Sequence, residues 1–207
     1  MGDKKALQAG TSHYLGQNFA KAFDVTFQTE DNTEELVYAT SWGVSTRLIG
    51  ALIMVHGDDK GLRLPPKVAP TQVVIVPIIR KDSNPDDIHN YINNLTSTLK
   101  DNNIRINVDM REKLSPGHKF NEWEMKGIPI RVEVGPRDME NQELVICRRD
   151  ENTKQTVNIN DASNVIIELL DSIQSNLFNQ AQSFMDSHTV NVNTWDAFKE
   201  NINFFFS

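Results

Sequence analysis

The sequence predicts an α/β protein, and three observations support that class. Residues 72–79 (QVVIVPII) form a continuous apolar run, which is typical of a strand buried on both faces of a parallel sheet. Residues 128–134 (IPIRVEV) alternate apolar and polar side chains, as a strand with two different faces does. Residues 161–186 carry apolar side chains at helical spacing. Strands alternating with helices predict a mixed β-sheet covered by helices.

The first part of the chain ends at a Pro-rich stretch, residues 64–67 (LPPK), which we expect to be a hinge. Before it, strand-like pieces lie around residues 23–29 and 35–38. Residues 45–55 (STRLIGALIMV) are apolar at helical spacing and predict a buried helix with Ser45 or Thr46 near its N-cap. A helix that begins beside an arginine is suited to hold an anion or a nucleotide.

After the hinge, each further element follows from a local signal in the sequence. Asn, Pro and acidic residues at 82–87 predict a helix start, and Ser-Pro-Gly at 115–117 predicts a turn into another helix. The expected elements after residue 79 are a helix to about 102, a strand over 104–110, a helix over 119–126, strands over 128–134, 143–149 and 154–159, and a helix from about 161 to 186.

The C-terminal segment is apolar, with Trp195, Phe198, Ile202 and three final phenylalanines before Ser207. Terminal residues are normally polar and solvated. Two interpretations remain open. These side chains dock on the core, or the natural protein continues beyond this point.

Composition excludes several classes of protein. The 207 residues contain no apolar run of about 18, so we expect no membrane span. The first ten residues lack the apolar region of a secretory signal, and the single Cys147 cannot form an internal disulfide. A cytoplasmic location is therefore expected. The net charge of −7 does not by itself indicate a nucleic-acid binder, although a mixed-sign surface can contain a local basic patch.

Motifs for independent chemistry are few. His56, Asp58 and Asp59 could bind a divalent ion, but a solvated turn is the favoured interpretation. Cys147 lies inside an apolar strand and is expected in the core rather than as a nucleophile.

Three longer stretches carry a specific resemblance: residues 6–19 (ALQAGTSHYLGQNF), 41–66 (SWGVSTRLIGALIMVHGDDKGLRLPP) and 115–138 (SPGHKFNEWEMKGIPIRVEVGPRD). In this order and spacing the chain resembles the class II prolyl-tRNA synthetases of the archaeal and eukaryotic type, almost continuously from residue 6 to about 150. The second stretch is similar to the family's motif 3, and the third to its anticodon-binding domain.

The resemblance implies a reaction and a nucleotide site. Enzymes of this family join proline to ATP as prolyl-adenylate, release pyrophosphate and transfer proline to tRNA(Pro), with Mg²⁺ expected alongside the ATP. The motif 3 arginine, which stacks on adenine, falls on Arg47. Gln8, Thr11 and Ser45 match the ATP site, and His13 and Trp42 match the proline pocket. Plain core packing of Trp42 remains an alternative.

The resemblance also implies that the second domain reads anticodon bases. Unpaired bases are recognised by stacking and by hydrogen bonds to their edges. The residues expected there are Lys119, Phe120, Trp123, Glu124, Arg131, Glu133 and Arg137. A structural ion-pair network among several of them is the open alternative.

The family's motifs 1 and 2 and its C-terminal domain have no counterpart in this sequence. We therefore expect a piece of a larger, homodimeric enzyme that is inactive alone. Its expected parts are 1–67, the end of the catalytic domain with antiparallel strands and the motif 3 helix; 68–186, the anticodon-binding domain; and 187–207, the start of a further domain. The alternative function is a tRNA anticodon-binding module without catalysis.

Overall fold

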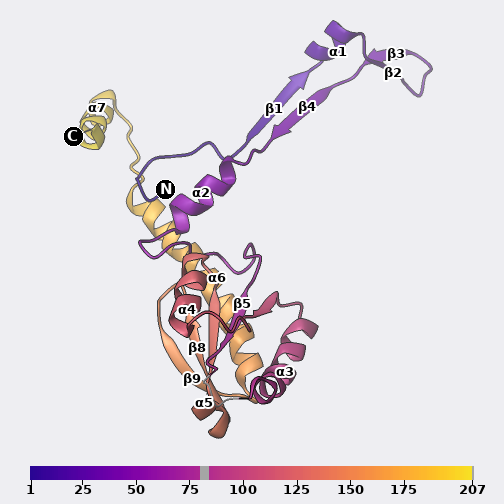
Figure 1. Ribbon diagram of the computed structural model, residues 1–207. Helices are drawn as coiled ribbons and strands as arrows, with labels where there is room; N and C mark the ends of the chain where they lie inside the picture. The colour runs from indigo at the N-terminus through magenta and orange to yellow at the C-terminus, as the bar shows by residue number, and fades with distance from the viewer. Residues whose placement is uncertain (80–83, 207) are drawn as a thin grey trace. The chain divides into compact units, whose positions relative to one another are not determined.

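The computed structural model describes residues 1–79 and 84–206, and the chain divides into two compact units, Met1–Val55 and His56–Ser207 (Figure 1). Residues 82 and 83, where we expected the start of a helix, lie outside the described part. The sequence placed the first domain boundary at Lys67, and the predicted domain limits stay a prediction. Within the described residues, no helix is long and apolar enough to cross a membrane.

The first unit consists of two short antiparallel strand pairs and two helices. β1 (Thr11–Gly16) pairs with β4 (Ala39–Gly43), and β2 (Thr26–Gln28) pairs with β3 (Glu34–Leu36). The sequence did not predict β1 or β4.

Two helices belong to this part of the chain. α1 (Asn18–Phe23) was not predicted and ends at the first residue of the segment expected as a strand, where Asp24, with φ 53°, terminates it in the left-handed conformation. α2 (Arg47–His56) confirms the predicted helix, and the Ser45 hydroxyl accepts a hydrogen bond from the Arg47 backbone N–H at 3.3 Å. The expectation that this helix is buried is wrong for the chain described here, because none of its residues is buried.

The second unit contains a five-stranded mixed sheet in the order β6-β5-β7-β8-β9. Its strands are β5 (Val73–Pro77), β6 (Ile106–Val108), β7 (Ile130–Val134), β8 (Glu143–Arg148) and β9 (Lys154–Asn158). β5 runs parallel to β6 and β7, whereas β8 is antiparallel to β7 and β9. The predicted α/β class with a mixed sheet is confirmed.

Helices cover both faces of this sheet. They are α3 (Pro85–Asp101), α4 (Pro116–Met125), α5 (Pro136–Glu140) and α6 (Ala162–Ser187), and α7 (Trp195–Phe206) follows (Figure 1). Asn84 and Ser115 cap α3 and α4 with side-chain hydrogen bonds. The sequence predicted α3, α4 and α6 and missed α5 and α7.

The hydrophobic core lies in the second unit. On one face of the sheet, Val73 and Ile75 of β5 pack in a large cluster with buried residues of α3 and α6. On the opposite face, Val74 and Val76 pack with Ile128 and with partly buried aromatic side chains of α4. Side chains of a strand alternate between faces, so α4 lies over the face opposite to α3 and α6. The cluster beneath α4 is the smaller one, which leaves room for polar side chains on that face.

Candidate functional site

Polar and charged side chains gather on the face of the sheet that α4 covers. Val74 of β5 pairs with Arg131 of β7, Arg131 pairs with Cys147 of β8, and Cys147 pairs with Lys154 of β9. Directly opposed residues on neighbouring strands share a face. The register therefore places these three polar side chains in a row beside the apolar patch under α4.

The carboxylate of Glu133, two residues after Arg131 on β7, joins this row together. It accepts hydrogen bonds from Arg131 Nε at 3.1 Å, from Lys154 Nζ at 2.9 Å and from Cys147 Sγ at 3.1 Å. Glu133 is 7% exposed, and its burial alone would raise the pKa. Hydrogen bonds from Lys154, Cys147 and Arg131 outweigh burial, and the pKa is lowered. Glu133 thus holds two cations in place.

The Cys147 thiol acts here as a hydrogen-bond donor. Burial raises its pKa to about 11, and the hydrogen bond to Glu133 adds to the shift. A thiol with such a pKa stays protonated near neutrality, whereas nucleophilic cysteines are thiolates. The expectation that Cys147 lies in the core is confirmed, because its side chain is buried.

The aromatic ring of Phe120, on α4, lies close to both cations held by Glu133. Arg131 Cζ is 4.5 Å from the ring centroid, and Lys154 Nζ is 5.8 Å from it. Cations at such distances are attracted to the negative face of the ring. Phe120 therefore supports the two basic side chains from the side of the helix.

A pocket of about 140 Å³ opens next to this cluster, and a cavity of about this volume can hold one six-membered ring. Its charged and aromatic lining residues include Lys60, Trp123, Glu124, Arg131, Arg149 and Lys154. Trp123 gives the pocket an aromatic wall, and Lys60, Arg131, Arg149 and Lys154 give it a cationic lining. The net charge of the whole chain is −7, so the pocket is the kind of local basic patch that a mixed-sign surface can contain.

The indole of Trp123 is fixed by a buried acid. Its Nε1–H donates to Asp109 Oδ2 at 2.8 Å, and the same carboxylate accepts from Arg111 Nε at 2.8 Å. The hydrogen bonds from Arg111 hold the pKa of Asp109 well below its usual range, against the effect of burial. An ionised Asp109 is thus a permanent acceptor that sets the orientation of the Trp123 ring.

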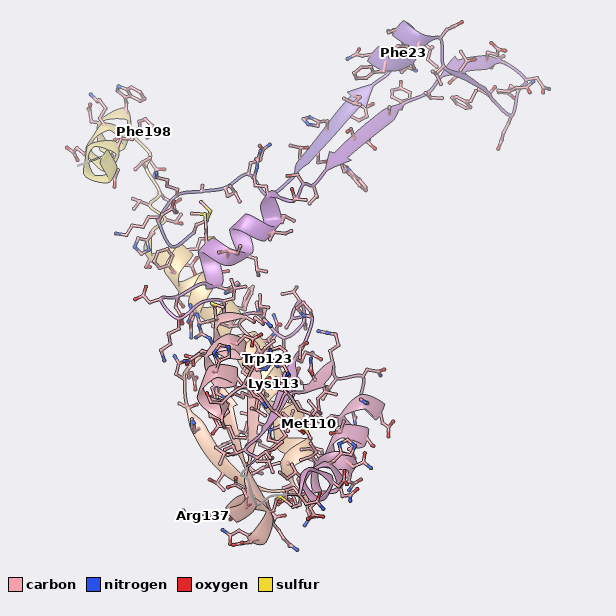
Figure 2. The ribbon with its side chains drawn as sticks, in the orientation of Figure 1. Phe23, Met110, Lys113, Trp123, Arg137 and Phe198 are labelled. Carbon is pink, nitrogen blue, oxygen red and sulfur yellow. The ribbon has the colours of Figure 1, made fainter. Side chains whose placement is uncertain are left out.

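Three of the seven predicted anticodon residues, Trp123, Glu124 and Arg131, line the pocket. Phe120 and Glu133 contact Arg131 without lining the pocket, and the remaining two have other places. Lys119 is 3% exposed, and its ammonium donates to the Asp109 carbonyl oxygen at 3.0 Å, so it supports the fold of α4. Arg137 lies on α5, and Figure 2 shows it at a separate place from Trp123 in the second unit. The open alternative of an ion-pair network also has support, because Glu133 is enclosed by donors.

In the first unit, the structure brings two of the predicted ATP-site residues together. Arg47 Nη1 donates to Gln8 Oε1 at 3.1 Å and lies 3.5 Å from the Gln8 carbonyl oxygen. Ser45 caps the backbone of Arg47, as described above. The guanidinium therefore projects from the first turn of α2 and is steadied by a segment 39 positions earlier in the chain.

The predicted proline-site residues do not face each other within the β1–β4 pair. Thr11 pairs with Gly43 and His13 with Ser41, whereas Ser12 pairs with Trp42. Because paired residues share a face, Thr11 and His13 lie on one face and Trp42 on the other. Trp42 is 80% exposed, so core packing does not account for it in this chain.

The part of the chain that the structure describes contains no group of three or more His, Cys, Asp or Glu side chains placed to hold a metal ion. The carboxylate of Asp58 instead binds the guanidinium of Arg149, with distances of 2.6 and 2.8 Å. Asp58 is thus engaged by a cation of the protein itself.

Sequence reasoning missed several residues of the pocket. Lys60 and Arg149 reach it through tertiary contacts of loops, which no periodic pattern reveals. Asp109 does not line the pocket but holds Trp123, which does. It could have been noticed as an acid at the end of a predicted strand, a common place for functional side chains.

Comparison with known proteins gives the second unit a class. Residues 72–169 match a family described as "Anticodon binding domain". The mixed-sheet part of the second unit accordingly contains an anticodon-binding α/β domain.

Relatives with similar sequences extend over nearly the whole chain. A proline–tRNA ligase of Porphyromonas gingivalis is 50% identical over 202 residues, which cover 98% of this chain and 41% of that protein. One from Rubrobacter xylanophilus is 50% identical over 200 residues, covering 97% of this chain and 42% of that protein.

A solved structure is also similar. A prolyl-tRNA synthetase from Cryptosporidium parvum, complexed with L-proline and AMP, matches with a TM-score of 0.86 and 42% identity, covering 97% of this chain and 43% of that one. The chain thus spans about two fifths of the length of these relatives. Over that length, it belongs to the prolyl-tRNA synthetase family.

Proposed function

We propose that this chain is part of an enzyme that activates proline with ATP and transfers it to tRNA(Pro). The chain supplies the motif 3 segment and the domain that recognises the anticodon. The observation that carries this proposal is the pocket beside Trp123, Glu124 and Arg131 in a domain whose residues 72–169 match an anticodon-binding family. Identity of about half to proline–tRNA ligases over 98% of the chain supports proline as the amino acid.

The chemistry has two steps. A carboxylate oxygen of proline attacks the α-phosphorus of ATP, and pyrophosphate leaves. A ribose hydroxyl of the tRNA then attacks the carbonyl carbon of the adenylate, and AMP leaves. Proline supplies its own nucleophile in the first step, so the protein mainly orients the reactants and stabilises developing charge.

Arg47 is the residue of this chain that we assign to the nucleotide. A planar guanidinium can stack on adenine and bind a phosphate, which lysine does less well. The hydrogen bond to Gln8 holds that plane in place. Thr11 and Ser45 complete the proposed ATP contacts, and His13 and Trp42 are proposed to line opposite sides of the proline site in the whole enzyme.

Mg²⁺ is expected with the phosphates of ATP. The described residues of this chain offer no cluster of ligands that fits the ion, and no step is assigned to it here. The whole enzyme is proposed to be a homodimer in the cytoplasm, by similarity to the family.

In the anticodon domain, the proposed division of work follows from the contacts. The fixed ring of Trp123 offers a surface for stacking on a base. The Glu124 carboxylate accepts from the N–H groups of a guanine edge, and Arg131 donates to base acceptors. Glu133 and Phe120 hold Arg131, and Lys119 supports α4. We assign no base to Arg137.

Two measurements test the proposal. Proline-dependent ATP–pyrophosphate exchange should be absent in the 207-residue chain, because the arginine and acid of motif 2 are expected upstream. In the full-length enzyme, Arg47→Ala should abolish the exchange without unfolding the protein. Proline-specific exchange by the chain alone, or unchanged exchange by the Arg47 variant, would contradict these assignments.

Binding of an anticodon stem-loop tests the second domain. Arg131→Ala should weaken binding of the tRNA(Pro) stem-loop more than binding of one with a scrambled anticodon. Lys100→Ala, at an exposed lysine in the last turn of α3, serves as the control and should change neither. If Arg131→Ala weakens binding of both RNAs equally, the assignment of Arg131 to base recognition is wrong.

A further inference from the structure

Lys60 lines the pocket together with Trp123, Glu124 and Arg131, although it lies outside the residues that match the anticodon-binding family. It belongs to the segment of residues 57–61 (GDDKG), which follows α2 in the chain. A basic side chain from a loop that precedes the whole sheet is therefore part of the pocket wall.

The loop around Lys60 is held in a defined shape. Asp58 and Gly61 exchange two backbone hydrogen bonds, of 2.9 and 3.0 Å, and Lys60 N–H donates to Asp58 Oδ1 at 2.9 Å. The carboxylate of Asp58 is in turn bound by the guanidinium of Arg149, a buried residue that directly follows β8. The same arginine donates from Nε to the carbonyl oxygen of Glu124 at 3.1 Å. Arg149 thus fastens both the loop and the Glu124 backbone.

Gly61 lets this loop lie directly against the end of α4. Its φ is +125°, and a Cβ at this position would lie 2.5 Å from the carbonyl oxygen of Met125. The next residue, Leu62, donates its backbone N–H to that same oxygen at 3.0 Å. The backbone carrying Lys60 is therefore in contact with the helix that supplies Trp123 and Glu124.

The ammonium of Lys60 is available for exchange. Its partner is Glu124 Oε1 at 3.2 Å, and the side chain of Lys60 is 59% exposed. The Glu124 side chain is 21% exposed, so the lysine is the open end of this ion pair. Water and salt compete for an exposed charge, which keeps the net free energy of such a pair small. Arg149 and Arg148, which also line the pocket, differ from Lys60 in exposure. Their side chains are 4% and 14% exposed, and they pair with Asp58 and Asp150 respectively.

We infer that Lys60 is a further RNA-binding residue of this pocket and binds a phosphate of the single-stranded RNA next to the base that the pocket receives. Its ammonium exchanges Glu124 for the phosphate, which leaves the carboxylate free to accept from the base edge. The inference rests on the proposed anticodon function and adds to it a backbone contact made by the loop before the domain.

The experiment is salt-dependent binding of the tRNA(Pro) anticodon stem-loop to the 207-residue chain. Each phosphate contact of a single strand contributes about 0.7 to the slope of log affinity against log salt. Lys60→Ala should reduce the slope by about 0.7 and weaken binding about two- to fivefold. Lys60→Arg should keep the slope, and Lys100→Ala is the matched control.

The outcomes separate the inference from the proposed function. An unchanged slope with Lys60→Ala overturns the phosphate contact, even if binding weakens. The same titrations compare the affinity for the tRNA(Pro) stem-loop with the affinity for a stem-loop with a scrambled anticodon. A wild-type chain that binds without discrimination contradicts the proposed function, while a reduced slope in Lys60→Ala would still support the contact. A wild-type chain that binds no RNA overturns both. Thermal unfolding of Lys60→Ala should match the wild type, since the side chain is exposed.

Discussion

Glu133 illustrates how one buried carboxylate can organise a binding surface without touching the ligand. It accepts hydrogen bonds from Arg131, Cys147 and Lys154, which come from three neighbouring strands. In the absence of this charge, two cations would share the ring of Phe120 with no anion between them. The position of Arg131 therefore depends on Glu133.

The variant Glu133→Gln tests the role of this carboxylate. The amide keeps the shape but loses the charge, and the free energy of unfolding should fall by about 2 kcal/mol, as for loss of hydrogen bonds to a charged group. Urea unfolding measures this. Glu140→Gln, at an exposed residue of α5, should stay within about 0.5 kcal/mol of wild type. If both variants unfold alike, Glu133 does not hold the cluster.

Asp58 gives a prediction for pH. Hydrogen bonds from Arg149 lower its pKa from 3.8 to about 2. A carboxyl group with a lowered folded-state pKa stabilises the protein fully above its ordinary pKa, and this contribution is lost as the pH falls through the folded value. The stability difference between wild type and Asp58→Asn should therefore be large at pH 6 and shrink between about pH 4 and pH 2.

Chemical denaturation at several pH values checks the Asp58 prediction. Asp59→Asn, at the exposed neighbouring position, is the control and should show a small difference throughout. A difference between wild type and Asp58→Asn that stays constant down to pH 2 would show that the pairing with Arg149 does not stabilise the folded state.

Most helices and strands of the second unit could be predicted from the sequence, because their burial requires apolar side chains at regular spacing. The apolar run at 72–79 became β5, and the long amphipathic stretch became α6 with a row of buried side chains. β1 and β4 were not readable. Their sequences, TSHYLG and ATSWG, show no apolar face, and in this chain neither strand contains a buried residue.

Only some residues of the pocket could be predicted from the sequence, for a related reason. Resemblance pointed to Trp123, Glu124 and Arg131, all of which line it. The row formed by Arg131, Cys147 and Lys154 depends on strand register, and Lys60 depends on a loop docking on α4. Neither register nor docking follows from periodicity. Lys119 also looked suited to a nucleic acid, but its buried ammonium supports Asp109 instead.

The loop that carries Lys60 yields a prediction about backbone geometry. Gly61→Ala places a Cβ at φ +125° and 2.5 Å from a backbone oxygen of α4. Such conformations cost about 1–3 kcal/mol for other residues, and the contact adds to the strain. The free energy of unfolding should fall by at least that amount. Gly117→Ala is the control, because its Cβ would meet nothing within 4 Å and alanine favours a helix. Equal stabilities would mean that the loop can leave α4 freely.

The two units differ in what stabilises them. Of the buried apolar residues, Ala20 is the one that the described part of the first unit contributes, and the others lie in the second unit. Large apolar side chains of the first unit are exposed, among them Tyr14 at 74%, Trp42 at 80% and Ile49 at 61%. Exposed apolar surface of this extent marks an interaction face or an aggregation liability. The first unit therefore lacks a core of its own in this chain.

Hydrogen exchange of the 207-residue chain should report this difference directly. Amides of β5, β7 and β8 pair within a buried sheet, so they should exchange only through global unfolding. Amides of β1 and β4 belong to an exposed strand pair and should open locally at a small fraction of that free energy, because few buried contacts close them. In the full-length enzyme, where we expect further strands beside this pair, the same amides should become protected. Comparable protection of β1 and β5 in the 207-residue chain would contradict the argument, since it would require the first unit to be stabilised by contacts other than a buried core.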